Sequence, residues 1–117
     1  MRKLVRPYLN DILGEIADID GIMQGKSLGD YDSDRRLQKV VKRSIEIMSE
    51  AARRIPQELC DSRPEVRWHQ IRAIGNVLRH EYRDVINGIL YAVIRDDLRA
   101  LKAAILAIDA TLDEPRE

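Results

Sequence analysis

Apolar residues recur along the chain at the three- and four-residue spacing of amphipathic helices. The first stripe consists of Val5, Leu9, Ile12, Ile16, Ile19 and Met23. Acidic residues lie between these positions, on the other side of a helix, and Gly25 follows the stripe. The spacing therefore predicts a helix that buries one face and ends near Gly25.

The second stripe has the same spacing and runs from Leu37 to Ile55, where Pro56, which cannot continue a helix, follows it. Residues 25–34 (GKSLGDYDSD) are rich in Gly, Ser and Asp, so we expect a loop that ends with Ser33 or Asp34 as N-cap of the second helix. Together the two stripes indicate a long hairpin with coiled-coil-like packing.

The next linker is expected at residues 57–63 (QELCDSR). Ser62 and Glu65 have the spacing of a capping box, which predicts a third helix that begins near Pro64 or a few residues later. This third helix contains the segment Trp68 to Tyr82.

The last third of the chain predicts two further helices. Apolar positions from Ile86 to Ile94 indicate a shorter fourth helix, and we expect Asp96 to cap a final helix that reaches Ile108. The tail TLDEPRE is expected to fray.

The pattern contains no strand alternation and no repeat, and 117 residues suit a single domain over residues 1–117. We therefore predict an all-α, up-down bundle of four to five helices. The core must be aliphatic, because the chain has no Phe and one Trp. The stripes are wide for so small a domain. Since burial is worth about 25 cal/mol per Å² of apolar surface, we expect a homodimer.

The composition restricts which kinds of functional site and which location we expect for the protein. Cys60 is the only cysteine, which excludes an internal disulfide and suits a reducing cytosol. With neither a signal peptide nor a long apolar run, we expect a cytoplasmic protein without a membrane span. Two histidines eleven positions apart and one distant cysteine predict no metal site. No Gly-rich phosphate loop occurs, and we expect no cofactor.

Positive charge gathers in the central segment, although the formal net charge of the chain is zero. Residues 63–83 hold five arginines against two glutamates, a net charge of +3, whereas the parts before and after carry 0 and −3. This distribution argues against non-specific coating of nucleic acid and predicts a local polyanion site.

Helical spacing divides the central segment into two faces. Trp68, Ile71, Gly75, Leu78 and Tyr82 share an apolar face, whereas Arg72, Asn76 and His80 share a polar one flanked by Arg79 and Arg83. Histidine titrates near neutrality and arginine is a fixed cation, which is the pair that chemistry at a phosphodiester needs.

Plainer explanations compete with this one. His80 would also suit the end of a helix dipole, Arg79 and Arg83 a solvated face, and Tyr82 the edge of the core. Gly75 costs about 1 kcal/mol relative to Ala in a helix, so either close helix packing or the approach of a ligand has to explain it.

The string WHQIRAIGNVLRHEYRDV, followed by a short apolar helix and DDLRALKAAI, resembles the HEPN-domain toxins of the HepT type. PYLNDILGEIADI and SIEIMSEAARRIP resemble the first two helices of that family, so the resemblance covers about residues 7 to 108. It implies an all-α homodimer that acts as a metal-independent endoribonuclease. It also implies an antitoxin partner that is a minimal nucleotidyltransferase.

By position, the resemblance assigns Asn76 to the polar motif residue, His80 to the catalytic histidine and Tyr82 to the tyrosine that the partner enzyme modifies with AMP. Gly75 stands where the family usually has an arginine, and either Arg72 or Arg79 is the candidate substitute.

The expected mechanism is attack by the RNA's own 2′-hydroxyl, with His80 as general acid or base and Arg79 or Arg72 stabilising the phosphorane. Asn76 would orient His80 or bind a phosphate oxygen, and Arg79 and Arg83 would bind RNA. The alternative is a weak or inactive HEPN module that binds RNA or docks a nucleotidyltransferase.

Overall fold

The structure is a computed structural model that describes residues 4–115, and within this range it contains seven helices and no strand. The helices are α1 (Arg6–Met23), α2 (Leu28–Ser33), α3 (Arg35–Arg53), α4 (Gln57–Asp61), α5 (Trp68–Arg79), α6 (Arg83–Asp96) and α7 (Leu98–Thr111). The predicted all-α class is confirmed. None of the helices in this range is long and apolar enough to cross a membrane.

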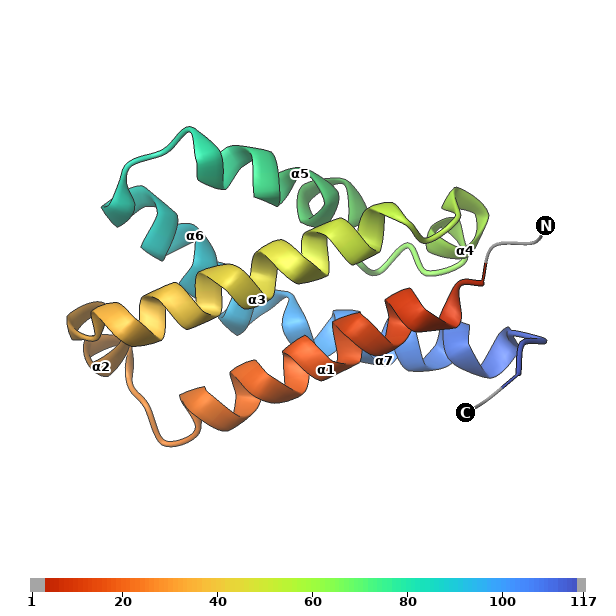
Figure 1. The fold of residues 1–117 in the computed structure, drawn as a ribbon, viewed down its shortest axis with the longest axis horizontal. Helices are drawn as coiled ribbons and strands as arrows, with labels where there is room; N and C mark the ends of the chain where they lie inside the picture. The colour runs from red at the N-terminus through yellow and green to blue at the C-terminus, as the bar shows by residue number, and fades with distance from the viewer. Residues whose placement is uncertain (1–3, 116–117) are drawn as a thin grey trace.

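The long helices form an up-down arrangement around α3 (Figure 1). α1 and α5 run along opposite sides of α3, and α7 lies against α1. α6 leads back from the free end of α5, and α7 continues toward the end of the molecule where both termini lie. The core is thus enclosed by α1, α3, α5 and the pair α6 and α7.

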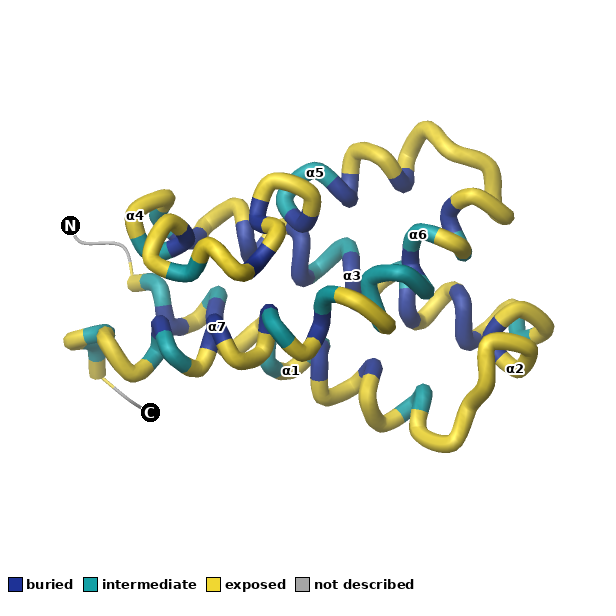
Figure 2. The backbone as a smooth tube through the Cα atoms, turned by 180° about the vertical axis from the view of Figure 1, so that it is seen from behind, coloured by how far each residue is buried: buried dark blue, intermediate teal, exposed yellow. Residues whose placement is uncertain are grey.

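The core is aliphatic, as the composition predicted, and the predicted stripes supply it. Fully or almost fully buried stripe residues of α1 and α3 are Leu9, Ile12, Ile16, Ile19, Val41, Ile45 and Met48. Figure 2 shows that buried positions alternate with exposed ones along each helix, on the side that faces the neighbouring helices. Helical periodicity therefore decided which residues enter the core.

The loop predicted for residues 25–34 is wrong, because α2 forms inside it. The Ser27 hydroxyl accepts from Asp30 N, and the Asp30 carboxylate accepts from Ser27 N, which is a complete capping box. The hydrogen bonds from the Ser27 backbone and side chain lower the pKa of the Asp30 carboxyl. Tyr31 is completely buried, and its ring lies 5.5 Å from that of Tyr91 in α6. Of the two predicted N-caps of α3, Asp34 is the one used, through Leu37 N.

The second predicted linker is also partly helical. α4 starts directly after Pro56, and its residue Cys60 is completely buried, so burial stabilises this short helix. The predicted capping box at Ser62 is wrong, because the Ser62 hydroxyl donates to Leu59 O instead. α5 nevertheless begins at Trp68, which agrees with the predicted start a few residues after Pro64.

The junction between α6 and α7 differs from its prediction as well. Asp96 belongs to α6 and pairs with Arg95 at 2.7 Å, so it does not cap the last helix. Asp97 is the N-cap residue of α7, but its carboxylate accepts a fork of hydrogen bonds from Arg67 at 2.8–2.9 Å. This ion pair joins the start of α5 to the α6–α7 junction.

The tail after α7 is tied down, so the prediction that it frays is wrong up to Pro115, while residues 116–117 lie outside the described range. The Glu114 carboxylate accepts from Val5 N and Arg6 N at the start of α1, where anions are favoured. Arg6, only 6% exposed, donates to the Asp109 carboxylate at 2.7 Å and to its carbonyl at 3.1 Å. Both ends of the described chain are therefore fixed to one another.

Arg6→Ala is expected to lower the free energy of unfolding by about 3 kcal/mol, because it removes a buried guanidinium that joins α1 to α7 and the tail. Chemical denaturation monitored by circular dichroism measures the change. Arg36→Ala is the matched control, since Arg36 is exposed and forms no ion pair within residues 4–115, and it should cost less than about 0.5 kcal/mol. Equal losses in the two variants would contradict the anchoring role.

Candidate functional site

The central polar segment lies at a corner between two helices. α5 ends at Arg79, and His80 is its C-cap, with φ −116° and ψ 6°. Tyr82 is the N-cap of α6, so the chain reverses direction over three residues. In Figure 1 this corner projects from the rest of the bundle, and Figure 2 shows it as exposed backbone. The side chains of His80, Glu81 and Tyr82 at this corner are exposed to solvent.

The predicted apolar face of α5 is confirmed except at its last position. Trp68, Ile71, Gly75 and Leu78 are buried, but Tyr82 is 85% exposed. Because the helix ends three residues before Tyr82, the helical spacing no longer applies there. Tyr82 is therefore neither part of the apolar face nor at the edge of the core, and its hydroxyl is open to solvent.

Three of the predicted site residues lie together and unoccupied at the end of α5. Asn76, Arg79 and His80 are exposed, and their side chains form no hydrogen bond or ion pair with any part of residues 4–115. Arg79 lies in the last turn of the helix, where the macrodipole favours a cation. These side chains are free to meet a ligand.

Arg72, the fourth candidate, has a structural role. Its Nε donates to Ala52 O at 3.2 Å and its Nη2 to Ile55 O at 2.8 Å, which satisfies carbonyls at the end of α3. The same guanidinium donates to Gln57 Oε1 at 2.6 Å and contacts Cys60 Sγ at 3.1 Å. Of the two candidate substitutes for the family arginine, Arg72 is thus bonded to the fold, whereas Arg79 forms no hydrogen bond or ion pair within residues 4–115.

Gly75 faces side chains of α3 and not its backbone. It is buried, its N–H lies 3.4 Å from Ser49 Oγ of α3, and a Cβ here would be 3.2 Å from Arg53 Nη2. The Arg53 side chain is held over α5 by a bond from its Nε to Arg72 O at 3.0 Å. Arg53 therefore brings a guanidinium beside the position where the family usually has its arginine. Sequence spacing could not show this, because Arg53 comes from another helix.

Arg83 is held rather than merely solvated. Its Nη2 donates to Gln38 Oε1 at 3.0 Å. Gln38 is only 5% exposed, and its amide nitrogen donates to the carbonyls of Tyr31 and Asp32 at 2.8 and 2.9 Å. The buried amide has one orientation that satisfies all three partners, so it fixes Arg83 beside α3.

A groove with a basic lining runs between α3 and α6, next to Arg83. It has a volume of about 210 Å³ and is lined by Arg35, Gln38, Lys39, Lys42, Arg83, Ile86 and Asn87. The prediction of a local positive site identified only Arg83 among these cations. The sequence did contain a signal for the other cations, because residues 35–43 hold five basic residues and no acidic one. The net charge of the whole segment before residue 63 is zero, and this average concealed the basic run.

Comparison with known proteins decides the family. A family model described as "Ribonuclease HepT-like" matches residues 12–108. The chain belongs to the HepT-like family. This confirms the resemblance that the central segment carries, and it assigns ribonuclease activity at the level of the family.

Curated relatives of this HepT-like chain bear ribonuclease names. It is 33% identical over 114 residues to the "Gamma-glutamylcyclotransferase and putative RNase" of Methanocaldococcus jannaschii, covering 97% of this chain and 51% of that protein, so it spans about half of that relative. It is 28% identical to the "Probable ribonuclease HepT" of Thermococcus cleftensis, with 87% of this chain and 93% of the relative covered. A "Putative RNase" of Caldanaerobacter subterraneus subsp. tengcongensis is 31% identical, with 91% and 95% covered. No solved structure matches significantly.

Two other features of the HepT-like chain are less suited to chemistry. Cys60 is buried, and desolvation raises the pKa of its thiol even though the charge of Arg72 opposes the shift, so it is a poor nucleophile. Within residues 4–115, no three or more His, Cys, Asp or Glu side chains come together in a way that could hold a metal ion.

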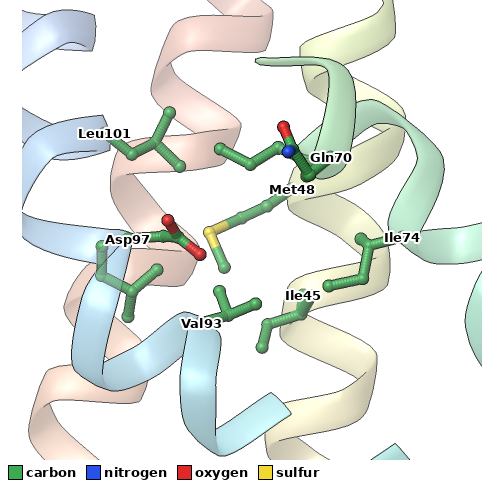
Figure 3. A pocket seen from close by; sticks show the side chains of 9 residues that line it. Ile45, Met48, Gln70, Ile74, Val93, Asp97 and Leu101 are labelled. Carbon is green, nitrogen blue, oxygen red and sulfur yellow. The ribbon is translucent and has the colours of Figure 1, made fainter. Parts of the chain in front are cut away.

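An apolar pocket lies between α3, α5, α6 and α7 (Figure 3). Ile45, Met48, Ile74, Val93 and Leu101 line it, with the polar groups of Gln70 and Asp97 nearby. Its volume is only about 30 Å³, far below that of ordinary ligand sites, and none of the predicted site residues borders it. We interpret it as a packing gap of the core.

The different roles of Arg72 and Arg79 lead to a stability prediction. Arg72→Ala should lower the free energy of unfolding by about 2–3 kcal/mol, because it leaves carbonyls at the end of α3 without their donor. Arg79→Ala should change it by less than about 0.5 kcal/mol, since its guanidinium forms no hydrogen bond or ion pair in the described range. Urea denaturation of both variants tests this, and a large loss for Arg79→Ala would show that it is also used by the fold.

Proposed function

We propose that this protein is a metal-independent endoribonuclease that cleaves RNA through the RNA's own 2′-hydroxyl and acts as the toxin of a toxin–antitoxin pair. One observation carries the proposal: in a chain of the HepT-like family, Asn76, Arg79 and His80 are exposed and unpaired together at a projecting corner. Side chains with no structural task at such a place are available for a substrate.

The reaction needs a proton acceptor, a proton donor and a cation. The 2′-oxygen attacks the adjacent phosphorus while its proton is taken up, and the bond to the 5′-oxygen breaks as that oxygen gains a proton. His80 supplies one or both of these proton transfers, which are typically worth about 10²–10⁴-fold in rate. The products are a 2′,3′-cyclic phosphate and a 5′-hydroxyl.

Arg79 is the cation that we assign to the phosphorane, because it adjoins His80 and has an unoccupied guanidinium. Arg72 is a weaker candidate, since the end of α3 occupies its donors. Asn76 lies one helical turn before His80 and would orient the imidazole or hold a phosphate oxygen. Arg83 would bind the RNA beside this corner.

A second copy of the chain is proposed to complete the site. The corner projects from the bundle, where a second copy of the chain could pack against it (Figure 1). Exposed apolar residues surround it: Val77 is 38%, Tyr82 85% and Val85 46% exposed. A homodimer that buries this region would bring two copies of His80 together around one strand of RNA.

Regulation is proposed to act on Tyr82, through a nucleotidyltransferase antitoxin in the same cytoplasm. The Tyr82 hydroxyl would attack the α-phosphate of ATP, which joins AMP to the tyrosine and releases pyrophosphate. The added phosphate would place a negative charge next to Arg83 and bulk at the corner. The 85% exposure of Tyr82 supports access by a partner enzyme.

A second candidate is a weak or inactive module that binds RNA or docks the partner without cleavage. The observation that favours it is Gly75: position 75 carries no cation and is packed against α3. Catalysis then depends on whether Arg79 substitutes for the missing arginine.

His80→Ala should lower the rate of RNA cleavage by about 10² or more, since it removes the proposed acid or base. His69→Ala is the matched control, because His69 is an exposed histidine in the first turn of the same helix and should leave the rate unchanged. The assay uses purified protein with EDTA and a labelled RNA, beside the same RNA with a 2′-deoxy nucleotide at the cleaved position.

Three results would count against the mechanism: cleavage of the 2′-deoxy substrate, a requirement for added Mg²⁺, or full activity of His80→Ala. Growth arrest that persists unchanged in His80→Ala would favour the binding module.

Co-expression with the proposed antitoxin should add the mass of one AMP group to the wild-type chain and none to Tyr82→Phe. Mass spectrometry of the intact protein and of its peptides measures this. Tyr8→Phe serves as the control, since it removes a tyrosine far from the corner in the sequence. An inhibited complex whose Tyr82 is unmodified would refute this mode of regulation.

A further inference from the structure

We propose that the basic groove between α3 and α6 binds the phosphates of single-stranded RNA and leads the strand away from the cleavage corner. This inference rests on the proposed ribonuclease function. It extends that function with cations of α3 that are not among the predicted site residues. The groove cations are Arg35, Lys39, Lys42 and Arg83.

The groove cations of α3 have no structural task. Within residues 4–115, none of Arg35, Lys39 and Lys42 forms an ion pair or a side-chain hydrogen bond. No carboxylate lines the groove, and the acidic residues closest in sequence, Asp34 and Asp84, are not among its lining residues. The groove therefore presents four cations that form no ion pair within residues 4–115.

The cations of α3 also lie close to one another. Arg35 is the first residue of α3 and Lys39 lies one turn further on, so the two form a like-charged i, i+4 pair. Like charges at this spacing destabilise a helix, and an anionic ligand bound beside them would offset that repulsion.

The spacing of the cations fits a polymer rather than a single small anion. Residues 35, 39 and 42 follow one another at i, i+4 and i+7 on one side of α3, over about 10 Å of helix axis. On the facing side, Arg83 is held in place by the buried Gln38. Proteins bind single strands through positive grooves that follow the phosphate backbone in this way.

The groove and the candidate site are adjacent along the chain. Arg83 lines the groove and follows directly after Tyr82, three residues beyond His80. A strand cleaved at the corner would thus pass its neighbouring phosphates from Arg83 to Lys42, Lys39 and Arg35. Because phosphates carry no sequence information, this contact would strengthen RNA binding without selecting a sequence.

The test compares two double variants that remove the same charge from the same helix. Lys39→Gln/Lys42→Gln alters the groove, whereas Arg36→Gln/Arg43→Gln removes two exposed cations that do not line it. The probe is a fluorescent single-stranded RNA of about 20 nucleotides with 2′-O-methyl groups, which cannot be cleaved through the 2′-hydroxyl but retains its phosphates. Anisotropy gives the affinity over a series of salt concentrations.

The groove variant should bind on the order of 25-fold more weakly at about 0.1 M salt. Its plot of log affinity against log salt should be shallower by about 1.4, which is about 0.7 for each of two lost phosphate contacts. The control variant should stay within about twofold of wild type. Circular dichroism should show both variants folded.

Equal losses in both variants would overturn the proposal, since the charge and not the groove would then matter. Unchanged RNA affinity would also overturn it, and loss of antitoxin binding in the same variant would then assign the groove to an acidic protein partner.

Cleavage kinetics separate this inference from the proposed function. The groove variant should raise KM for a long RNA and leave the cleavage of a dinucleotide unchanged, because a dinucleotide does not reach the groove. If wild-type protein cleaves no RNA, the proposed function fails, but the anisotropy comparison still decides the groove because it needs no cleavage.

Discussion

The contact between α3 and α5 is the interaction on which the rest of the molecule depends. The Arg72 side chain donates to carbonyls at the end of α3, and its own carbonyl accepts from Ser49 Oγ at 3.2 Å and from Arg53 Nε at 3.0 Å. Gly75 faces the side chains of Ser49 and Arg53 in the same contact. Hydrogen bonds that involve a charged group contribute about 1.5–3 kcal/mol each, so this contact holds α5 against α3 and thereby positions the corner at the end of α5.

That contact also explains how a chain of zero net charge obtains a basic face. Arginines that hold the fold together are paired or bonded: Arg6 with Asp109, Arg67 with Asp97, and Arg72 with the end of α3. Several of the cations without an ion pair within residues 4–115 lie at the corner and along the α3–α6 groove. Charge separation between structural and unoccupied arginines, rather than an excess of basic residues, thus creates a local site for a polyanion.

The corner and the groove both depart from what stability alone favours. His80, Tyr82 and their neighbours are exposed and form few contacts, and Arg35 and Lys39 place two like charges one turn apart in α3. Residues kept in unfavourable surroundings are characteristic of binding and catalytic sites, where the ligand restores the balance. The buried Gln38 shows that part of this arrangement is held rigidly, since it orients Arg83 before any ligand binds.

The sequence by itself determined the helical class, the core stripes and the family, because helical periodicity and a linked motif are local properties of the chain. The structure corrected it where distant partners decide. α2 and α4 form because Tyr31 and Cys60 are buried against other helices, and the tail is ordered because Glu114 meets the start of α1. Likewise, helical spacing alone placed Arg72 and His80 on the same face of one helix. In the structure, the Arg72 guanidinium donates to a carbonyl beyond the end of α3, whereas α5 ends before His80 and leaves that side chain exposed. These tertiary features distinguish a structural arginine from a candidate catalytic histidine.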